Sequence, residues 1–140
     1  DGTVSVVTQI LGPSVVGSPT VYNSALSRYN NITYDSSNNK VVIIYRDTDS
    51  PGYGTAIVGT VSGSSISFGT PVVFESSAVS METGAVTFDS SNNKVVISFR
   101  DLGDGARGKA IVGTVSGTAA RHCHQQKCEF PVSGRYGDVH

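Results

Sequence analysis

The side chains of this chain that could bind a ligand gather in two short polar loops. Each loop opens with an Arg-Asp step and carries another aspartate shortly afterwards. A guanidinium can donate two parallel hydrogen bonds to a carboxylate or to neighbouring sugar hydroxyls. An aromatic ring beside such groups can stack on the apolar face of a sugar. The candidate ligand-binding residues are therefore Arg46, Asp47, Asp49, Tyr53, Arg100, Asp101 and Asp104.

Two other interpretations of these loops stay open. Asp101-Leu-Gly-Asp-Gly105 superficially resembles a calcium loop, in which carboxylates gather around a hard cation. It lacks the spaced third carboxylate and the closing glutamate of an EF-hand, and Asx turns in a glycine-rich connection account for the same residues. The Arg-Asp steps can also pair across neighbouring structural units and hold the loops. We expect no resident cofactor, with calcium as the alternative.

A second group of reactive side chains lies near the end of the chain. His122, Cys123, His124 and Cys128 are soft ligands in a short span, but their spacing matches no standard zinc finger. A small Cys123–Cys128 disulfide in an exported protein is the favoured interpretation, with two free thiols or a metal site as alternatives. All the histidines lie in this region, so the two loops offer no catalytic triad. We therefore expect no catalytic residues.

The loops belong to an internal repeat. Thr33–Asp47 recurs as Thr87–Asp101, and Ala56–Gly63 recurs unchanged as Ala110–Gly117, both at a distance of 54 residues. A period of this length is typical of repeat proteins, whose units bury their apolar faces only against neighbouring units. The repeat thus predicts the architecture more firmly than the function.

The repeat also predicts the domain organisation. Gly2-Thr-Val-Ser5 and the stretch 18–25 match the closing part of a unit, since similar residues recur at 59–62 and 70–78. The chain starts at Asp1, without a Met or a signal-like segment. We expect a mature secreted product, a processed protein or an excerpt of a longer protein. The predicted divisions are a β-repeat domain at 1–117, with a half repeat at 1–25, a full repeat at 30–78 and a partial repeat at 84–117, and a divergent tail at 118–140.

Each full unit should contain four antiparallel strands. Ser-Ser-Asn-Asn and Asp-Gly-rich stretches predict turns, and the continuous Val-Val-Ile runs predict a strand covered on both faces. We expect a bend at Gly69-Thr70-Pro71, because proline cannot donate to a strand ladder. The predicted strands are 31–35, 40–46, 55–62, 65–74, 85–89, 94–100 and 109–116. The predicted core residues are Val41, Val42, Ile43, Ile57, Val58, Val95, Val96, Ile97, Ile111 and Val112, with Tyr45 and Phe99 also inside.

Composition supports an all-β chain and excludes some partners. Charged residues make up 15% of the chain, well below the average of about 25%. Sixteen glycines and abundant Ser, Thr and Val are typical of strands joined by many turns. The formal net charge of −1 provides no field that would attract nucleic acid or an anionic membrane, so we expect neither as a partner.

The sequence of the repeat resembles that of a known kind of protein. Asn-Asn-Lys-Val-Val-Ile-x-[Tyr/Phe]-Arg-Asp, followed by Ala-Ile-Val-Gly-Thr-Val-Ser-Gly, is similar to repeats in uncharacterised surface and tail-fibre-like proteins of marine bacteria and their phages. The resemblance covers residues 1–117 and brings no catalytic motif with it. It implies four-stranded, β-propeller-like blades. It also implies a place on the outside of a cell or a virion.

Three functions are consistent with these observations. The leading hypothesis is a non-enzymatic extracellular or virion-surface module for recognition or structural attachment, with a glycan as the expected ligand. Repeated sites would make weak single contacts useful through multivalency. The competing hypothesis is a glycoside hydrolase on a propeller scaffold. The third is a purely structural assembly subunit.

The number of units predicts self-association. Propellers use about four to eight blades, whereas this chain holds roughly two and a half by its repeat pattern. Unpaired edges of Val-rich strands are normally covered, because they template pairing with another chain. The stretch 129–133 of the tail could fold back as a missing strand. We expect a homo-oligomer or a larger assembly, and an open β-sandwich is the alternative fold.

Overall fold

The computed structural model describes Gly2, residues 16–124 and residues 127–129. This part of the chain is all-β and antiparallel, which confirms the predicted fold class. None of its segments forms a helix that is long and apolar enough to cross a membrane. The strands are β1 Ser27–Asp35, β2 Lys40–Asp47, β3 Tyr53–Ser62, β4 Ser65–Phe68, β5 Val72–Ser80, β6 Val86–Asp89, β7 Lys94–Asp101, β8 Arg107–Ser116, β9 Ala119–His124 and β10 Lys127–Glu129.

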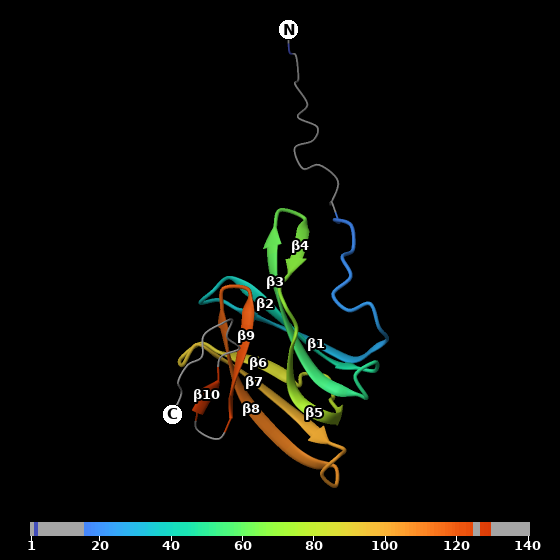
Figure 1. Cartoon of the computed structure of the whole chain (residues 1–140). Helices are drawn as coiled ribbons and strands as arrows, with labels where there is room; N and C mark the ends of the chain where they lie inside the picture. The colour runs from blue at the N-terminus through green and yellow to red at the C-terminus, as the bar shows by residue number, and fades with distance from the viewer. Residues whose placement is uncertain (1, 3–15, 125–126, 130–140) are drawn as a thin grey trace.

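The strands form one sheet that curls into a nearly closed, barrel-like shape (Figure 1). Its order is β1-β2-β3-β5-β7-β8-β9-β10, while β4 pairs with β3 and β6 pairs with β7. The curl brings β1 beside β6 and β9 beside β3 and β5. Because β6, β7 and β8 are the repeat counterparts of β1, β2 and β3, the two repeats form opposite walls of this body. The arrangement of the repeats as blades of a propeller stays a prediction.

The repeated Asp-Ser-Ser-Asn-Asn stretch makes the same turn in both repeats. Asp35 accepts hydrogen bonds from the backbone N–H of Ser37 at 2.9 Å and of Asn38 at 3.1 Å, and from the Asn38 side chain at 2.9 Å. Burial alone would raise the pKa of Asp35, but a hydrogen bond from the Ser37 hydroxyl at 2.6 Å, together with those from Asn38 and the Ser37 N–H, lowers it below its ordinary value. Asn39 and its counterpart Asn93 then take φ angles of 54° and 55°, the left-handed conformation that asparagine tolerates. The predicted turn is confirmed.

The structure bears out the predicted strands and corrects one of them. The stretch predicted as one strand at 65–74 forms β4 and part of β5, separated at Gly69-Thr70-Pro71, where a bend was expected. The tail supplies two further strands, β9 and β10, and β10 ends at Glu129, the first residue of the stretch 129–133. The rest of that predicted strand stays a prediction. Residues 130–133 lie outside the described residues. β9 pairs with β8 at residues 112–116, just as β4 pairs with β3 at residues 59–62.

The main core lies between the two repeats. One face of β2 and β3 packs toward one face of β7 and β8, with β5 and β6 completing the apolar interior. Its buried side chains are Val42, Ile44, Ala56, Val58, Phe74, Val79, Met81, Ala85, Val86, Val95, Ile97, Phe99 and Val115. A smaller cluster of Ile43, Tyr45 and Ile57 covers the other face of β2 and β3, with Tyr22 and Phe68 packed against it.

Equivalent residues of the two repeats therefore point in opposite directions. Val58 of β3 is 0% exposed, whereas its counterpart Val112 of β8 is 38% exposed. Ile44 of β2 is buried, whereas its counterpart Ser98 of β7 is exposed. The prediction of Val112 as a core residue is wrong for this reason. A strand covered on both faces is confirmed for β2 but is wrong for β7, whose burial alternates.

Candidate functional site

The two candidate loops connect equivalent strands and lie at the lower right of Figure 1, away from the β3–β4 hairpin. The first joins β2 to β3 and the second joins β7 to β8. In the first loop, Asp47 accepts a hydrogen bond from the backbone N–H of Asp49 at 3.1 Å and one from the Ser50 hydroxyl at 3.3 Å. These bonds form an Asx turn, so the Asp47 carboxylate closes its own loop. The Asp49 side chain is exposed.

Arg46 fastens β5 to the first repeat. Its Nη1 donates to the carbonyl oxygen of Val79 at 3.4 Å. A Cβ added at Gly52 would lie 2.7 Å from Arg46 Nε and 3.1 Å from the Cβ of Ala78, so the guanidinium lies in a tight space beside β5. No ion pair joins Arg46 to an aspartate among the described residues. The predicted pairing of the Arg-Asp steps is wrong here, because a backbone carbonyl takes the place of the carboxylate.

A charged cluster holds the second loop. Asp101 is 3% exposed and forms an ion pair with Lys109 Nζ at 2.5 Å. It also accepts hydrogen bonds from the Ser77 hydroxyl and from the backbone N–H of Gly103. Lys109 lies 3.4 Å from an oxygen of Asp104 and 3.8 Å from one of Glu75. One ammonium group therefore links β5, β7 and the loop that precedes β8.

The cluster perturbs both members of its closest pair. The hydrogen bond from Lys109, followed by that from Ser77, lowers the pKa of Asp101 below its ordinary value. The same bond to Asp101 raises the pKa of Lys109, and Asp104 and Glu75 add to that effect. Both groups are consequently charged near neutral pH. Because the two charged groups bind each other, few of their hydrogen-bonding positions are free to bind a ligand.

Arg100 differs from its counterpart Arg46, because it is exposed. It lines a surface groove of about 560 Å³ together with residues of β7, β8 and the connection from β5 to β6. The groove lining is Ser80, Met81, Glu82, Thr83, Gly84, Ala85, Ser98, Phe99, Arg100, Gly108, Lys109 and Ala110. The groove lies on the outer face of the second repeat, where Ser98 and Arg100 are exposed.

The aromatic side chains near the loops lie mostly inside. Tyr45 and Phe99 are 1% and 7% exposed, which confirms them as core residues. Burial, with a smaller contribution from Asp47, raises the pKa of Tyr45 to about 12. Tyr53 is half-buried, and Tyr34 on β1 is 52% exposed and donates to Asn39 at 2.8 Å. The described aromatic rings therefore do not form an open stacking platform beside Arg100.

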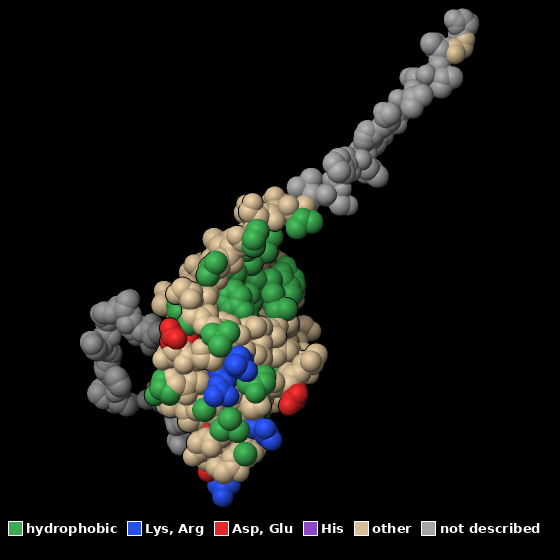
Figure 2. Space-filling view, turned by 90° about the vertical axis from the view of Figure 1, so that its right-hand side faces the viewer, with side chains coloured by type: hydrophobic (Ala, Val, Ile, Leu, Met, Phe, Trp, Pro, Cys, Tyr) green, Lys and Arg blue, Asp and Glu red, His purple; other side chains and the backbone are tan. Residues whose placement is uncertain are grey.

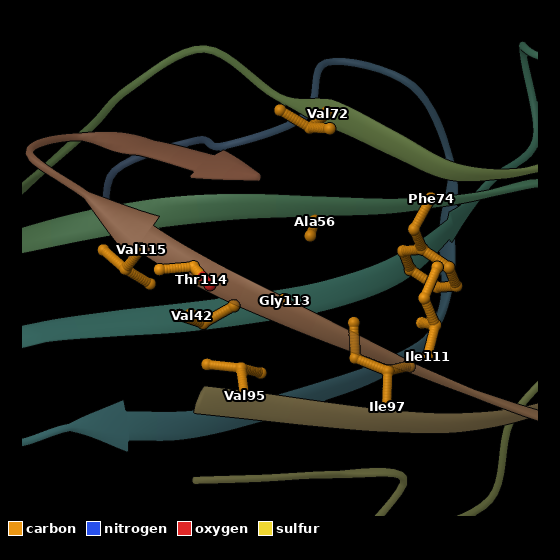
Figure 3. Close-up of a pocket in the computed structure, with 10 residues that line it drawn as sticks. All are labelled: Val42, Ala56, Val72, Phe74, Val95, Ile97, Ile111, Gly113, Thr114 and Val115. Carbon is orange, nitrogen blue, oxygen red and sulfur yellow. The ribbon is translucent and has the colours of Figure 1, made fainter. Parts of the chain in front are cut away.

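An internal cavity lies between the two repeats. Figure 3 shows Val42 and Ala56 of the first repeat facing Val95, Ile97 and other side chains of the second. The cavity has a volume of about 20 Å³ and a lining that is mainly apolar. It could hold about one water by size, but Thr114 is the one polar side chain in its lining, and a water needs about two to four polar partners. We regard it as a packing defect of the core and not as a binding site.

The cysteines lie opposite each other in the β9–β10 hairpin. The register of the two strands pairs Cys123 with Cys128 and places His122 opposite Glu129. The side chains of these residues lie outside the described residues, so the disulfide stays a prediction. No group of three or more His, Cys, Asp or Glu side chains that could hold a metal occurs within the described residues.

Sequence reasoning missed three members of the charged cluster, Glu75, Ser77 and Lys109. The signal for Lys109 was present, since it replaces Thr55 of the first repeat directly before the stretch Ala110–Gly117 that recurs unchanged. Glu75 and Ser77 lie on β5 and come close only because β5 runs from the first repeat to the second. Comparison of this chain with known protein families, with curated proteins and with solved structures gave no match.

Proposed function

We propose that this chain is a non-enzymatic structural attachment module of an extracellular or virion surface. The observation that carries the proposal is the use of its charged side chains. Arg46, Asp101 and Lys109 all contact β5 or residues next to it, and they hold one repeat against the other. A chain whose charged side chains join its repeats to each other is suited to present a rigid, repeated surface.

The low charge and the turn chemistry support the same role. The loops are closed by their own aspartates, so they are held in one conformation without a bound ligand. A rigid β-array resists proteolysis and unfolding at the exposed surface of a cell or particle.

Glycan recognition is a second candidate function, favoured by the groove at Arg100. The exposed guanidinium, the hydroxyls of Ser98 and Thr83, and the Glu82 carboxylate are groups that can bind sugar hydroxyls. The groove lacks an exposed aromatic ring in its lining, so the expected affinity of a single site is low. Multivalent presentation would be needed to make it useful.

A glycan array, run beside a panel of chromogenic glycosides, tests the proposal against the hydrolase alternative. We expect no turnover of any glycoside. Weak, multivalent glycan retention that Arg100→Ala abolishes and Arg28→Ala leaves intact would support the recognition role. Turnover that is lost in Glu82→Gln, with an unchanged circular dichroism spectrum, would overturn the non-enzymatic proposal.

A further inference from the structure

The segment that precedes β1 sits on the first repeat in the way that the segment containing β5 sits on the second. We call residues 17–27 the entry segment and residues 69–79 the linking segment. The Tyr22 and Tyr45 rings lie 5.2 Å apart with 57° between their planes. The Phe74 and Phe99 rings, one repeat further on, lie 5.3 Å apart with 58° between theirs. The two ring pairs are the same contact in successive repeats.

The backbone repeats this equivalence. Thr48 N donates to Leu26 O at 3.2 Å, and its repeat counterpart Leu102 N donates to Ala78 O at 2.8 Å. The ladders agree, because Ser27 lies opposite Asp47 as Val79 lies opposite Asp101. The entry segment is therefore the counterpart of the linking segment, displaced by one repeat.

The linking segment, however, has a second partner. On its other side β5 pairs with the start of β3, where Gly54 lies opposite Glu75 and Ala56 opposite Val72. The Phe74 ring covers Gly54 so closely that an added Cβ would lie 2.5 Å from it. Together with the Arg46 bond to Val79 O, these contacts join the linking segment to the repeat before it as well as to the repeat after it.

The entry segment has no such partner among the described residues. No described strand pairs with residues 17–26. Val21 is 76% exposed, whereas its counterpart Val73 is 41% exposed. Figure 2 shows hydrophobic side chains gathered on the face next to this segment. The surface that β3 covers on the linking segment is thus open on the entry segment.

The matching surface is open at the other end of the molecule. β8 pairs with β7 on one side and with β9 on the other, but only residues 112–116 of β8 pair with β9. Residues 107–110, which we call the acceptor edge, correspond to residues 53–56 of β3 and have no second strand in the described chain. A Cβ added at Gly108 would meet nothing within 4 Å, unlike one at Gly54. Arg100 lines the groove and is the repeat counterpart of Arg46, which donates to a backbone carbonyl.

We propose that copies of this chain associate head to tail, with the entry segment of one copy adding as a strand to the acceptor edge of another. The Tyr22 ring of the incoming copy would cover Gly108, and Arg100 would donate to a backbone carbonyl near Ser27. The occupant is a second copy because one chain carries both halves of its own internal interface, and on this interface neither half has a strand partner among the described residues. Strand addition satisfies the open N–H and C=O groups of both edges.

The geometry of this contact decides the kind of assembly. The two surfaces differ, so the interface is heterologous and builds a ring if its rotation closes or a filament if it does not. The inference deepens the proposed structural role and rests on it, because assembly is how such a module would act. The two remain separable, since turnover in the glycoside assay would overturn the role without changing the mass of the assembly.

Sedimentation of the full chain at micromolar to sub-millimolar concentration tests the interface. We expect masses that are multiples of 14.6 kDa and that grow with concentration or stop at one closed ring. Gly108→Val should abolish the association, because the new side chain occupies the place of the incoming ring. Ser67→Val, which adds the same side chain at an exposed position of β4, should leave it intact.

Two further measurements remove the ambiguity of a single variant. Arg100→Ala, at an exposed side chain, should weaken association roughly two- to tenfold, the effect of about one hydrogen bond. Gly108→Val added to the natural chain should shorten its assemblies, because that variant can still donate its entry segment. A chain that stays at 14.6 kDa throughout, or a folded Gly108→Val variant that assembles like the natural chain, would overturn the inference.

Discussion

At the scale of single residues, Lys109 determines how the second loop is built. Its ammonium lies between Asp101, Asp104 and Glu75, whereas the first repeat has the neutral Thr55 in the same place and closes its loop with Asp47 alone. The two loops are therefore alike in sequence but are held by different chemistry. The ion pair of the second loop makes the stability of the chain depend on pH.

Asp101→Asn tests this contact through the pH dependence of stability. Because the pKa of Asp101 is lowered in the folded chain, its contribution is fully present above the ordinary carboxyl pKa of about 4. The contribution is lost as the pH falls through the lowered value. We expect denaturant midpoints that fall between about pH 5 and pH 2, with a smaller fall in Asp101→Asn. The exposed Asp49→Asn is the control, and equal slopes for all three proteins would contradict the assignment.

At the scale of the elements, the Asp-Ser-Ser-Asn-Asn turn sets the register of each strand pair. Its last asparagine has a positive φ in both repeats. Asn93→Val should lower the free energy of unfolding by about 1–2 kcal/mol, because a β-branched side chain clashes in this conformation. Asn93→Gly should be nearly neutral, since glycine adopts it without strain. Urea denaturation of both variants measures the difference, and equal losses would show that φ is not the cause.

The β9–β10 hairpin places Cys123 opposite Cys128. Cα atoms of directly opposed residues lie about 4.5–5.5 Å apart in antiparallel strands, within the range of about 4.4–6.8 Å that a disulfide spans. We expect non-reducing mass spectrometry of the chain purified under oxidising conditions to show a loss of about 2 Da and no thiol that reacts with iodoacetamide. Full alkylation without prior reduction would contradict this.

At the scale of the whole molecule, the two repeats use opposite faces of equivalent strands. The inner wall of the first repeat packs on the inner wall of the second. Residues that are buried in the main core in one repeat therefore have counterparts on the outer face in the other. Within the part of the chain that the structure describes, the relation between the repeats leaves the entry segment and the acceptor edge each without a strand partner on one side. Assembly would extend the internal packing by one more step.

Paired substitutions measure this asymmetry. Val58→Ala should cost about 2–3 kcal/mol, because it removes buried methyl groups and leaves a cavity. Val112→Ala, at the equivalent position, should change stability by less than about 0.5 kcal/mol, as a surface substitution does. Both are measured at a concentration where the chain is monomeric. Equal costs would mean that the outer face of β8 is covered in the monomer.

The sequence by itself determined the local structure of this protein. The residues that recur at a distance of 54, the turn residues and the Val-rich runs predicted an all-β chain and most strand bounds. Turns and strands can be predicted in this way because they depend on φ preferences and hydrogen bonding within a few residues. The sequence also identified the loops of Arg46 and Arg100. It could not show which groups those side chains contact. The two repeats have nearly identical sequences here, and these carry no information about which segment packs against each loop.

Only the tertiary structure decided which face of each repeat is buried. The curl of the sheet places the repeats on opposite walls, so Val58 lies inside and its counterpart Val112 lies outside. Both residues occur in copies of the same eight-residue sequence. The tertiary structure likewise brought Glu75 of β5 to Lys109 and Ser77 of β5 to Asp101, and among the described residues it gave Arg100 no counterpart of the carbonyl that Arg46 binds. Burial depends on the neighbour that covers a face, and in a repeat protein that neighbour is set by position in the array, not by the repeat's own residues.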